Sequence, residues 1–211
     1  MSLRTREPIS WLIVSALERL CALALLLALL PFLLVIATVI AALSQRSPLI
    51  AHRRLARGGS PLWVLKFRTM WQREPVPGRF ALVEHIVDEA GPRDKGANDA
   101  RISSRFARYC RRHSIDELPQ LVHVVLGEMS LVGPRPITDS EWKQHYCPHA
   151  AEVLEVKPGI SGLWQTMGRS RLTYEQRRDL DLELVRNRSA KLYFQILLWT
   201  LPEIWSGRNA R

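Results

Sequence analysis

Asp116 and Glu117 form an adjacent pair of carboxylates within the segment SIDELPQ, residues 114–120. Such a pair can do chemistry, because one carboxylate can attack as a nucleophile while its neighbour holds a divalent cation. Ser114 and Glu117 also have the spacing of a capping box, so the pair is equally well explained as the start of a helix that runs to Gly127. A helix start and nearby arginines favour the charged form, and we expect both carboxylates to be ionised at neutral pH.

Basic side chains are concentrated in the part of the chain that precedes this pair. Residues 46–73 contain seven Lys and Arg residues and no acidic residue. Within them, an apolar run over 62–70 has the composition of a strand and contains Lys66 and Arg68. Residues two apart on a strand share one face, so these two cations are expected to point the same way.

Four arginines come just before the Asp-Glu pair at helical spacing: Arg101, Arg105, Arg108 and Arg112. The spacing places them on one stripe of a predicted helix over 101–112. The same helix has apolar side chains for packing: Ile102, Phe106, Tyr109 and Cys110. The stripe is interpreted either as a solvated basic face or as a surface that faces phosphate or lipid, and the spacing alone favours neither.

Composition limits the classes of protein to which the chain can belong. It has 211 residues, of which 47% are hydrophobic and 24% charged, and this excludes global disorder. Thirty Lys and Arg residues against twenty acidic ones give a net charge of +10, which predicts an anionic partner. Three widely spaced cysteines, without a CxxC pair, argue against a disulfide scaffold and against a cysteine zinc site.

An apolar segment near the N-terminus predicts membrane association. Residues 20–45 contain no charged side chain, and as a helix they would be about 39 Å long, which exceeds the ~30 Å hydrocarbon core. Pro31 lies near the middle and predicts a kink, and basic residues flank both ends. Two arrangements remain open: a re-entrant helical hairpin with both ends in the cytoplasm, and a single kinked transmembrane helix.

Four sequence blocks occur in a fixed order: KFRTM (66–70), SIDELPQ (114–120), GEMSLVGPRP (127–136) and KPGISGLWQ (157–165). Together they resemble the bacterial sugar transferases, monotopic polyprenyl-phosphate phosphoglycosyl transferases that begin surface-glycan assembly. The resemblance covers residues 10–205. In length, the chain is similar to a minimal catalytic form of the family. It implies transfer of a sugar 1-phosphate from a UDP-sugar to a polyprenyl phosphate, with release of UMP. It further implies that Asp116 forms an acyl-phosphate intermediate and that Glu117 is associated with Mg²⁺.

The resemblance also implies substrate-binding residues: Lys66, Arg68, Arg135 and Asp181. Arg112, from the arginine stripe, is assigned to the same set. Arg135 stands between two prolines, which limit the backbone entropy lost when its side chain binds an anion. The alternative for Arg135 is a rigid surface turn with no role in binding. The alternative for Asp181 is a solvated acid on a helix.

These observations predict an α/β fold, mostly helical with a small sheet, and associated with the membrane through an N-terminal re-entrant hairpin. Residues 1–45 form the membrane segment, and residues 46–211 form a catalytic domain on the cytoplasmic face of the bacterial inner membrane. The apolar stretch 192–201 is interpreted either as an interfacial helix or as ordinary core packing. The expected partners are a UDP-sugar, a polyprenyl phosphate and membrane lipid, with no nucleic acid. The sequence leaves open the sugar, a homo-oligomer, and a non-enzymatic membrane-anchored module that binds acidic lipid or nucleic acid.

Overall fold

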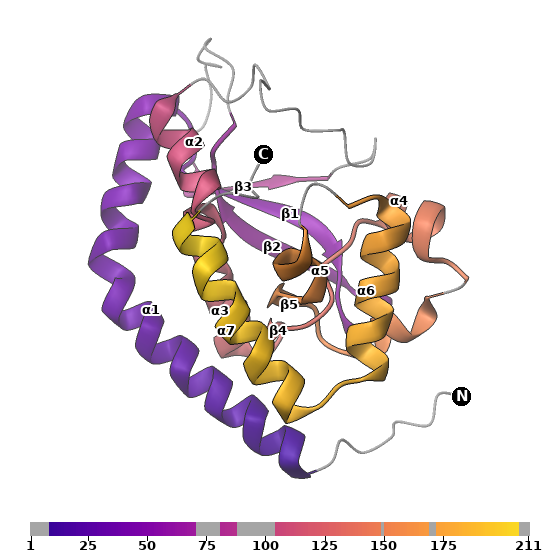
Figure 1. Cartoon of the computed structure of the whole chain (residues 1–211). Helices are drawn as coiled ribbons and strands as arrows, with labels where there is room; N and C mark the ends of the chain where they lie inside the picture. The colour runs from indigo at the N-terminus through magenta and orange to yellow at the C-terminus, as the bar shows by residue number, and fades with distance from the viewer. Residues whose placement is uncertain (1–8, 71–80, 88–103, 149, 169–171, 207–211) are drawn as a thin grey trace.

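The computed structural model describes residues 9–70, 81–87, 104–148, 150–168 and 172–206. One long N-terminal helix runs along the side of an α/β body, in which strands are surrounded by shorter helices (Figure 1). This agrees with the prediction of a mostly helical chain with a small sheet. The N-terminal helix ends at Ser44, next to the predicted boundary at residue 45.

The α-helices are α1 (Ile9–Ser44), α2 (Arg105–Arg112), α3 (Leu121–Leu126), α4 (Asp139–Glu141), α5 (Leu163–Met167), α6 (Tyr174–Arg186) and α7 (Ala190–Ser206). The short 3-10 segments are η1 (Arg57–Gly59), η2 (Ile115–Gln120) and η4 (Ala151–Glu155), and the π-helical turn is η3 (Trp142–Tyr146). The strands are β1 (Leu49–Leu55), β2 (Pro61–Phe67), β3 (Val83–Ile86), β4 (Ser130–Val132) and β5 (Gly159–Ser161).

The larger sheet has three strands in the order β2-β1-β3. Strands β1 and β2 form an antiparallel hairpin, while β3 pairs with β1 in parallel. The hairpin turns at Gly58 and Gly59, whose φ values of 77° and 75° are adopted readily by glycine alone. The predicted strand over 62–70 therefore exists, but it ends at Phe67.

A second, two-stranded sheet pairs β4 with β5 in parallel. The Gly133 N–H donates to the Ser161 carbonyl at 2.9 Å, and the Gly159 N–H donates to the Pro134 carbonyl at 2.8 Å. A Cβ on Gly133 would lie 2.6 Å from the Lys157 carbonyl oxygen, and one on Gly159 would overlap the Gly133 backbone. Glycine is thus required here for close backbone contact, and this contact fixes the path of the chain into Arg135.

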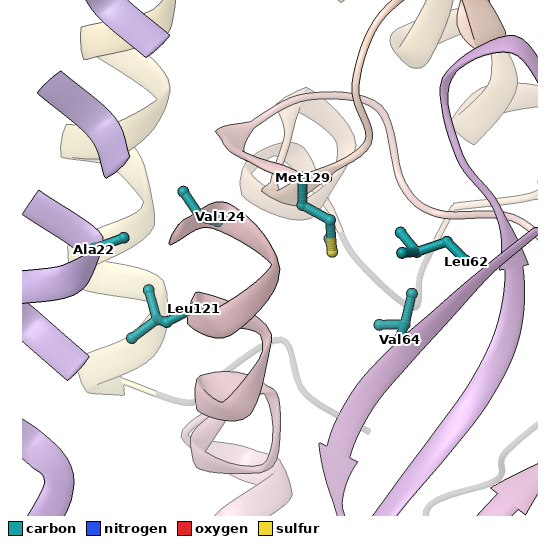
Figure 2. Packing of buried hydrophobic residues seen from close by; sticks show 6 residues of the cluster. All are labelled: Ala22, Leu62, Val64, Leu121, Val124 and Met129. Atoms are coloured by element: carbon teal, nitrogen blue, oxygen red, sulfur yellow. The ribbon is translucent and has the colours of Figure 1, made fainter. Parts of the chain in front are cut away.

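The core joins the N-terminal helix to the sheet and to α3. Figure 2 shows this cluster of buried side chains from α1, β2, α3 and the β4 approach: Ala22, Leu62, Val64, Leu121, Val124 and Met129. A second cluster places three residues from the later part of α1, Leu33, Ile36 and Ile40, against Phe67 and Cys110. Helix α1 is therefore part of the core along most of its length.

The structure does not confirm the predicted hairpin at Pro31, since α1 is one continuous helix of 36 residues that includes this proline. The helix curves along the body instead of folding back (Figure 1). Proline removes one helical hydrogen bond and bends a helix, but it does not force the helix to reverse. Segments on both sides of Pro31 pack against the same body, and this favours continuity. The helix remains long and apolar enough to cross a membrane by length and composition.

Helix α7 combines the two interpretations given for its apolar sequence. Tyr193 and Ile196 are buried against β4 and α5, whereas Leu198, Trp199 and Trp205 are exposed. One face therefore packs in the core, and the opposite face presents Trp and Leu side chains of the kind found at membrane interfaces.

Candidate active site

The Asp-Glu pair lies in the 3-10 segment η2, which packs closely on β2. The capping-box prediction is wrong: Ser114 has a left-handed conformation (φ 55°, ψ 22°) and makes no side-chain cap hydrogen bond. A capping residue needs an extended backbone, which this conformation does not provide. The Ser114 carbonyl instead accepts the Glu117 N–H at 3.1 Å, and the helix continues as α3 to Gly127, as predicted.

Lys66 and Glu117 meet between β2 and η2. The Lys66 Nζ donates to the Glu117 Oε1 at 2.6 Å, and 21% and 29% of the two side chains are exposed. A charge-assisted hydrogen bond of this length in a half-buried setting holds both groups in place. The structure thus joins two of the residues that the sequence assigned to chemistry, although they are separated by fifty-one positions.

Asp116 is half-buried beside this ion pair. Burial and, secondarily, the negative charge of Glu117 raise the pKa of Asp116 to about 6, while Lys66 and Arg111 oppose the shift. A carboxyl with a pKa of about 6 is mostly ionised at pH 7, as predicted for Asp116. The expected reason was incomplete, because desolvation outweighs the cations.

Cys110 lies behind the pair, on the buried face of α2. Burial raises the pKa of its thiol to about 11, and the charge of Asp116 adds to the shift. A thiol with this pKa is protonated at neutral pH and is a poor nucleophile. Of the two groups, the carboxylate of Asp116 is therefore the available nucleophile.

The arginine stripe is only partly described, because Arg101 and Ile102 lie outside the described residues. Arg112 is exposed at the end of α2, whereas its neighbour Arg111 is half-buried and interacts electrostatically with Asp116. Tyr109, expected to pack inside, is 56% exposed. The helical periodicity pointed to the stripe that contains Arg112, and no sequence signal distinguished Arg111.

Arg68 has a buried position. Its Nε donates to the Ser47 carbonyl at 2.8 Å, and its guanidinium pairs with Glu84 of β3 at 2.5 Å. Only 5% of the side chain is exposed. These contacts connect the end of β2 to the end of α1 and to β3, so they favour a structural role. Its assignment to substrate stays a prediction.

Arg135 and Asp181 come together in a second group, between the β4–β5 sheet and α6. The Arg135 N–H donates to Asp181 Oδ1 at 3.4 Å, and the Tyr146 hydroxyl donates to Oδ2 at 2.9 Å. Asp181 is fully buried, and burial raises its pKa to about 7 against these hydrogen bonds. Its carboxyl therefore holds the backbone of the Pro-Arg-Pro turn, and its surroundings differ from those of a solvated helix acid.

The oxygens of Asp116 and Glu117 are the ligand type that Mg²⁺ prefers. Among the residues that the structure describes, no group of three or more His, Cys, Asp or Glu side chains could hold a metal ion. Two carboxylates fit Mg²⁺, because this ion is usually bound by one or two carboxylates, while water and substrate phosphates complete its coordination.

Comparison with known proteins identifies the family of this chain. The family of bacterial sugar transferases matches residues 9–207. The exopolysaccharide production protein ExoY of Rhizobium meliloti is 33% identical over 206 residues, which cover 97% of this chain and 90% of that protein. The UDP-glucose:undecaprenyl-phosphate glucose-1-phosphate transferase of Caulobacter vibrioides is 34% identical, over 90% of this chain and 68% of its own length.

A further relative is much longer than this chain. The undecaprenyl-phosphate galactose phosphotransferase of Salmonella typhimurium is 39% identical over 138 residues, which are 64% of this chain and 29% of that protein. The family match extends over almost the whole chain and includes both groups of residues described above. The chain belongs to the bacterial sugar transferase family.

Proposed function

We propose that this protein transfers a sugar 1-phosphate from a UDP-sugar to a polyprenyl phosphate and releases UMP. The observation that carries the proposal is the position of the Asp116 carboxyl, half-buried beside the Lys66–Glu117 ion pair. The names of the relatives from Caulobacter vibrioides and Salmonella typhimurium support the substrates, since they specify undecaprenyl phosphate as the acceptor.

The reaction proceeds in two displacements at one phosphorus atom. The Asp116 carboxylate attacks the phosphorus that bears the sugar, the bond from this phosphorus to the bridging oxygen breaks, and UMP leaves. An oxygen of the polyprenyl phosphate then attacks the same phosphorus, and the acyl-phosphate bond breaks. This step regenerates Asp116 and gives the lipid-linked diphosphate sugar.

The surroundings of Asp116 fit the role of a nucleophile. A carboxyl with a pKa of about 6 is more basic than an ordinary aspartate, yet it needs no separate base at pH 7. Lys66 fixes Glu117 next to it and supplies a positive charge for the phosphates. Mg²⁺, held by Glu117 together with the substrate phosphates, would neutralise charge that develops on the diphosphate.

We further propose that the protein lies on the cytoplasmic face of the inner membrane with both ends of α1 on the same side. Glu18 and Ile40, about 33 Å apart on a helix, both contact the α/β body. A helix that crosses the bilayer along this length would bring the body into the hydrocarbon core. The outer face of α1 is apolar and exposed, for example at Leu20, Leu27 and Leu34, and suits burial in one leaflet.

The decisive experiment measures UMP release from a panel of UDP-sugars with polyprenyl phosphate and Mg²⁺. The purified chain is expected to release UMP with at least one sugar. Without acceptor, intact mass spectrometry should detect a sugar-phosphate adduct on the wild type and none on Asp116→Asn. No release with any sugar would contradict the proposed function and would favour a binding module. Release without an adduct would contradict the covalent step alone.

A further inference from the structure

Trp164 lies between two guanidinium groups that come from distant parts of the chain. The Arg135 guanidinium carbon is 5.4 Å from the centre of the Trp164 ring, and that of Arg177 is 5.2 Å from it. Arg177 also lies 5.0 Å from the Tyr174 ring. Two positive charges thus converge on one buried indole, and only 5% of this residue is exposed.

Two N–H groups in this cluster are buried and lack a hydrogen-bond partner among the residues that the structure describes. They are the Trp164 Nε1–H and the Arg177 Nε–H. Most buried polar side-chain atoms in proteins have a partner, and an unpaired buried donor destabilises the fold. Two of them in one cluster therefore require an explanation.

The cluster cannot satisfy these donors internally. Indole and guanidinium groups carry donors and no acceptors, so Arg135, Trp164 and Arg177 cannot form hydrogen bonds with one another. The cation–π contacts use the face of the indole ring and leave its N–H unpaired. The acid close by, Asp181, already accepts from Tyr146 and from the Arg135 backbone. Among the described residues no contact supplies the missing acceptor, and an oxygen of a bound ligand would complete the cluster.

We propose that the side chains of Arg135, Trp164 and Arg177 bind a phosphate oxyanion of a substrate. Two guanidiniums and an indole N–H match the charge and the acceptor oxygens of phosphate, and arginine is well suited to this ligand. The inference rests on the proposed function and adds Trp164 and Arg177 to the residues that contact substrate. The phosphate comes either from the nucleotide-sugar or from the polyprenyl carrier.

The elements that carry the three residues hold them rigidly. Trp164 lies in the first turn of α5, which packs on α6. Arg177 lies in the first turns of α6, whose start is fixed by a capping box between Thr173 and Gln176. The backbone of Arg135 is tied to Asp181. A binding site on such supported elements loses little entropy when the ligand arrives.

The test compares three variants with a matched control. Arg177→Gln removes the charge, Arg177→Lys keeps the charge but removes the Nε–H, and Trp164→Phe keeps an aromatic ring but removes the indole N–H. The control is Arg178→Gln on the same helix, because Arg178 pairs with Asp179 and the His145 carbonyl. Thermal unfolding of each full-length variant in detergent verifies the fold.

The measurements are binding of UDP and of inorganic pyrophosphate by calorimetry, and KM for each substrate separately. We expect Arg177→Gln to weaken anion binding by about tenfold to hundredfold and Trp164→Phe by about threefold to tenfold. A rise in KM for the UDP-sugar identifies the donor as the source of the phosphate, and a rise only for the polyprenyl phosphate identifies the acceptor. Arg178→Gln should leave all values within about twofold of the wild type.

The inference is overturned if the wild type releases UMP while Arg177→Gln and Trp164→Phe keep wild-type anion binding and both KM values. Failure of the proposed function gives a different result, in which the wild type releases no UMP with any sugar. Pyrophosphate binding still reports on the anion site in that case. If Arg177→Gln does not fold, the more conservative Arg177→Lys and Trp164→Phe variants decide the outcome by the same measurements.

Discussion

At the scale of single residues, Asp116 combines a charge that the proposed function needs with an unfavourable position for that charge. Its pKa of about 6 lies above the ordinary value of 3.8, so the folded protein binds more protons than the unfolded chain between these values. The contribution of the Asp116 carboxyl to folding stability is therefore fully present below pH 3.8, and it is lost as the pH rises through about 6. The ionised carboxylate that the proposed reaction needs at pH 7 therefore weakens the fold.

The first prediction follows from this conflict. Asp116→Asn should abolish turnover and should raise the free energy of unfolding at pH 7 by about 1 kcal/mol, because it removes a buried charge. Chemical denaturation at pH 7 and at pH 4.5 measures the effect, and the gain should shrink at the lower pH. A folded variant that keeps more than a few per cent of the wild-type rate would show that Asp116 is not the nucleophile.

The second prediction uses the two neighbours of Asp116, which act on its pKa in opposite directions. Lys66→Met removes a positive charge, so the acidic limb of the pH–rate profile should move to higher pH. Glu117→Gln removes a negative charge, so the limb should move to lower pH. The rate of adduct formation against pH measures both. Shifts in the same direction would contradict the electrostatic arrangement. Glu117→Gln should also weaken the dependence on Mg²⁺.

At the scale of elements, local sequence patterns predicted which helices and strands exist better than they predicted which side chains face the site. The apolar run correctly predicted a helix and the composition around Lys66 a strand. The segment SIDELPQ precedes a helix that ends at Leu126, with Gly127 as its C-cap. The left-handed Ser114 was not predictable, because few residues other than glycine adopt this conformation and no local signal marks it. Arg177 and Trp164 were also missed, since only tertiary packing brings them to Arg135.

Glu18 shows how α1 is attached to the body. Its Oε2 accepts hydrogen bonds from the Ser130 hydroxyl at 2.6 Å, the Tyr193 hydroxyl at 2.8 Å and the Leu131 N–H at 3.3 Å. The carboxyl is buried, with only 6% of the residue exposed. One side chain therefore joins α1, β4 and α7. The sequence pattern did not single it out, because it precedes the uncharged segment.

The third prediction concerns this junction. Glu18→Leu should destabilise the fold by about 2–4 kcal/mol, because three buried donors lose one acceptor. Glu18→Gln keeps an acceptor oxygen, so its loss of stability should be about half that of Glu18→Leu. Thermal unfolding in detergent measures both, with Glu183→Gln on α6 as a control. Equal stability of Glu18→Leu and the wild type would mean that water replaces the carboxylate at the junction.

His123 makes a comparable link between α3 and β2. Its Nε2 accepts the Leu65 N–H at 3.1 Å, and its Nδ1 lies 2.6 Å from Glu128 Oε2. An acceptor role for Nε2 places the ring proton on Nδ1, which donates to Glu128. The link is made at the residue before Lys66, so it holds the lysine in register with Glu117.

The fourth prediction tests that link. His123→Leu should cost about 1–3 kcal/mol of stability, because the Leu65 N–H loses its acceptor, and turnover should fall as Lys66 shifts. His123→Gln, which offers an acceptor oxygen, should recover part of the stability and part of the turnover. Denaturation and the rate of UMP release measure the two effects, with the exposed His85→Gln as a control. Stability lost without any change in rate would separate His123 from the positioning of Lys66.

At the scale of the whole molecule, α1 and α7 present exposed apolar side chains, while the proposed catalytic carboxylates lie on η2 where it packs on β2. A membrane-bound acceptor with its phosphate at the headgroup level needs this combination of a lipid-facing surface and a polar site in one body. The excess of Lys and Arg over acidic residues, 30 against 20, adds attraction to an anionic leaflet. Hydropathy alone predicted membrane contact, but it could not decide topology, because length and composition permit both a spanning and an interfacial helix.

The last prediction decides between these topologies. If α1 lies in one leaflet, cysteines placed at Ser2 and Ser60 are both on the cytoplasmic side; if α1 spans, they are on opposite sides. Exposed Cys21 and Cys147 are first replaced by Ser, while buried Cys110 is kept. With a thiol reagent that cannot cross the inner membrane, we expect both sites to be protected in intact spheroplasts and labelled after lysis. Labelling of one site alone before lysis would show that α1 crosses the bilayer. The contacts of Glu18 and Ile40 with one body would then have to break in the membrane, since both cannot reach a body that lies on one side of it.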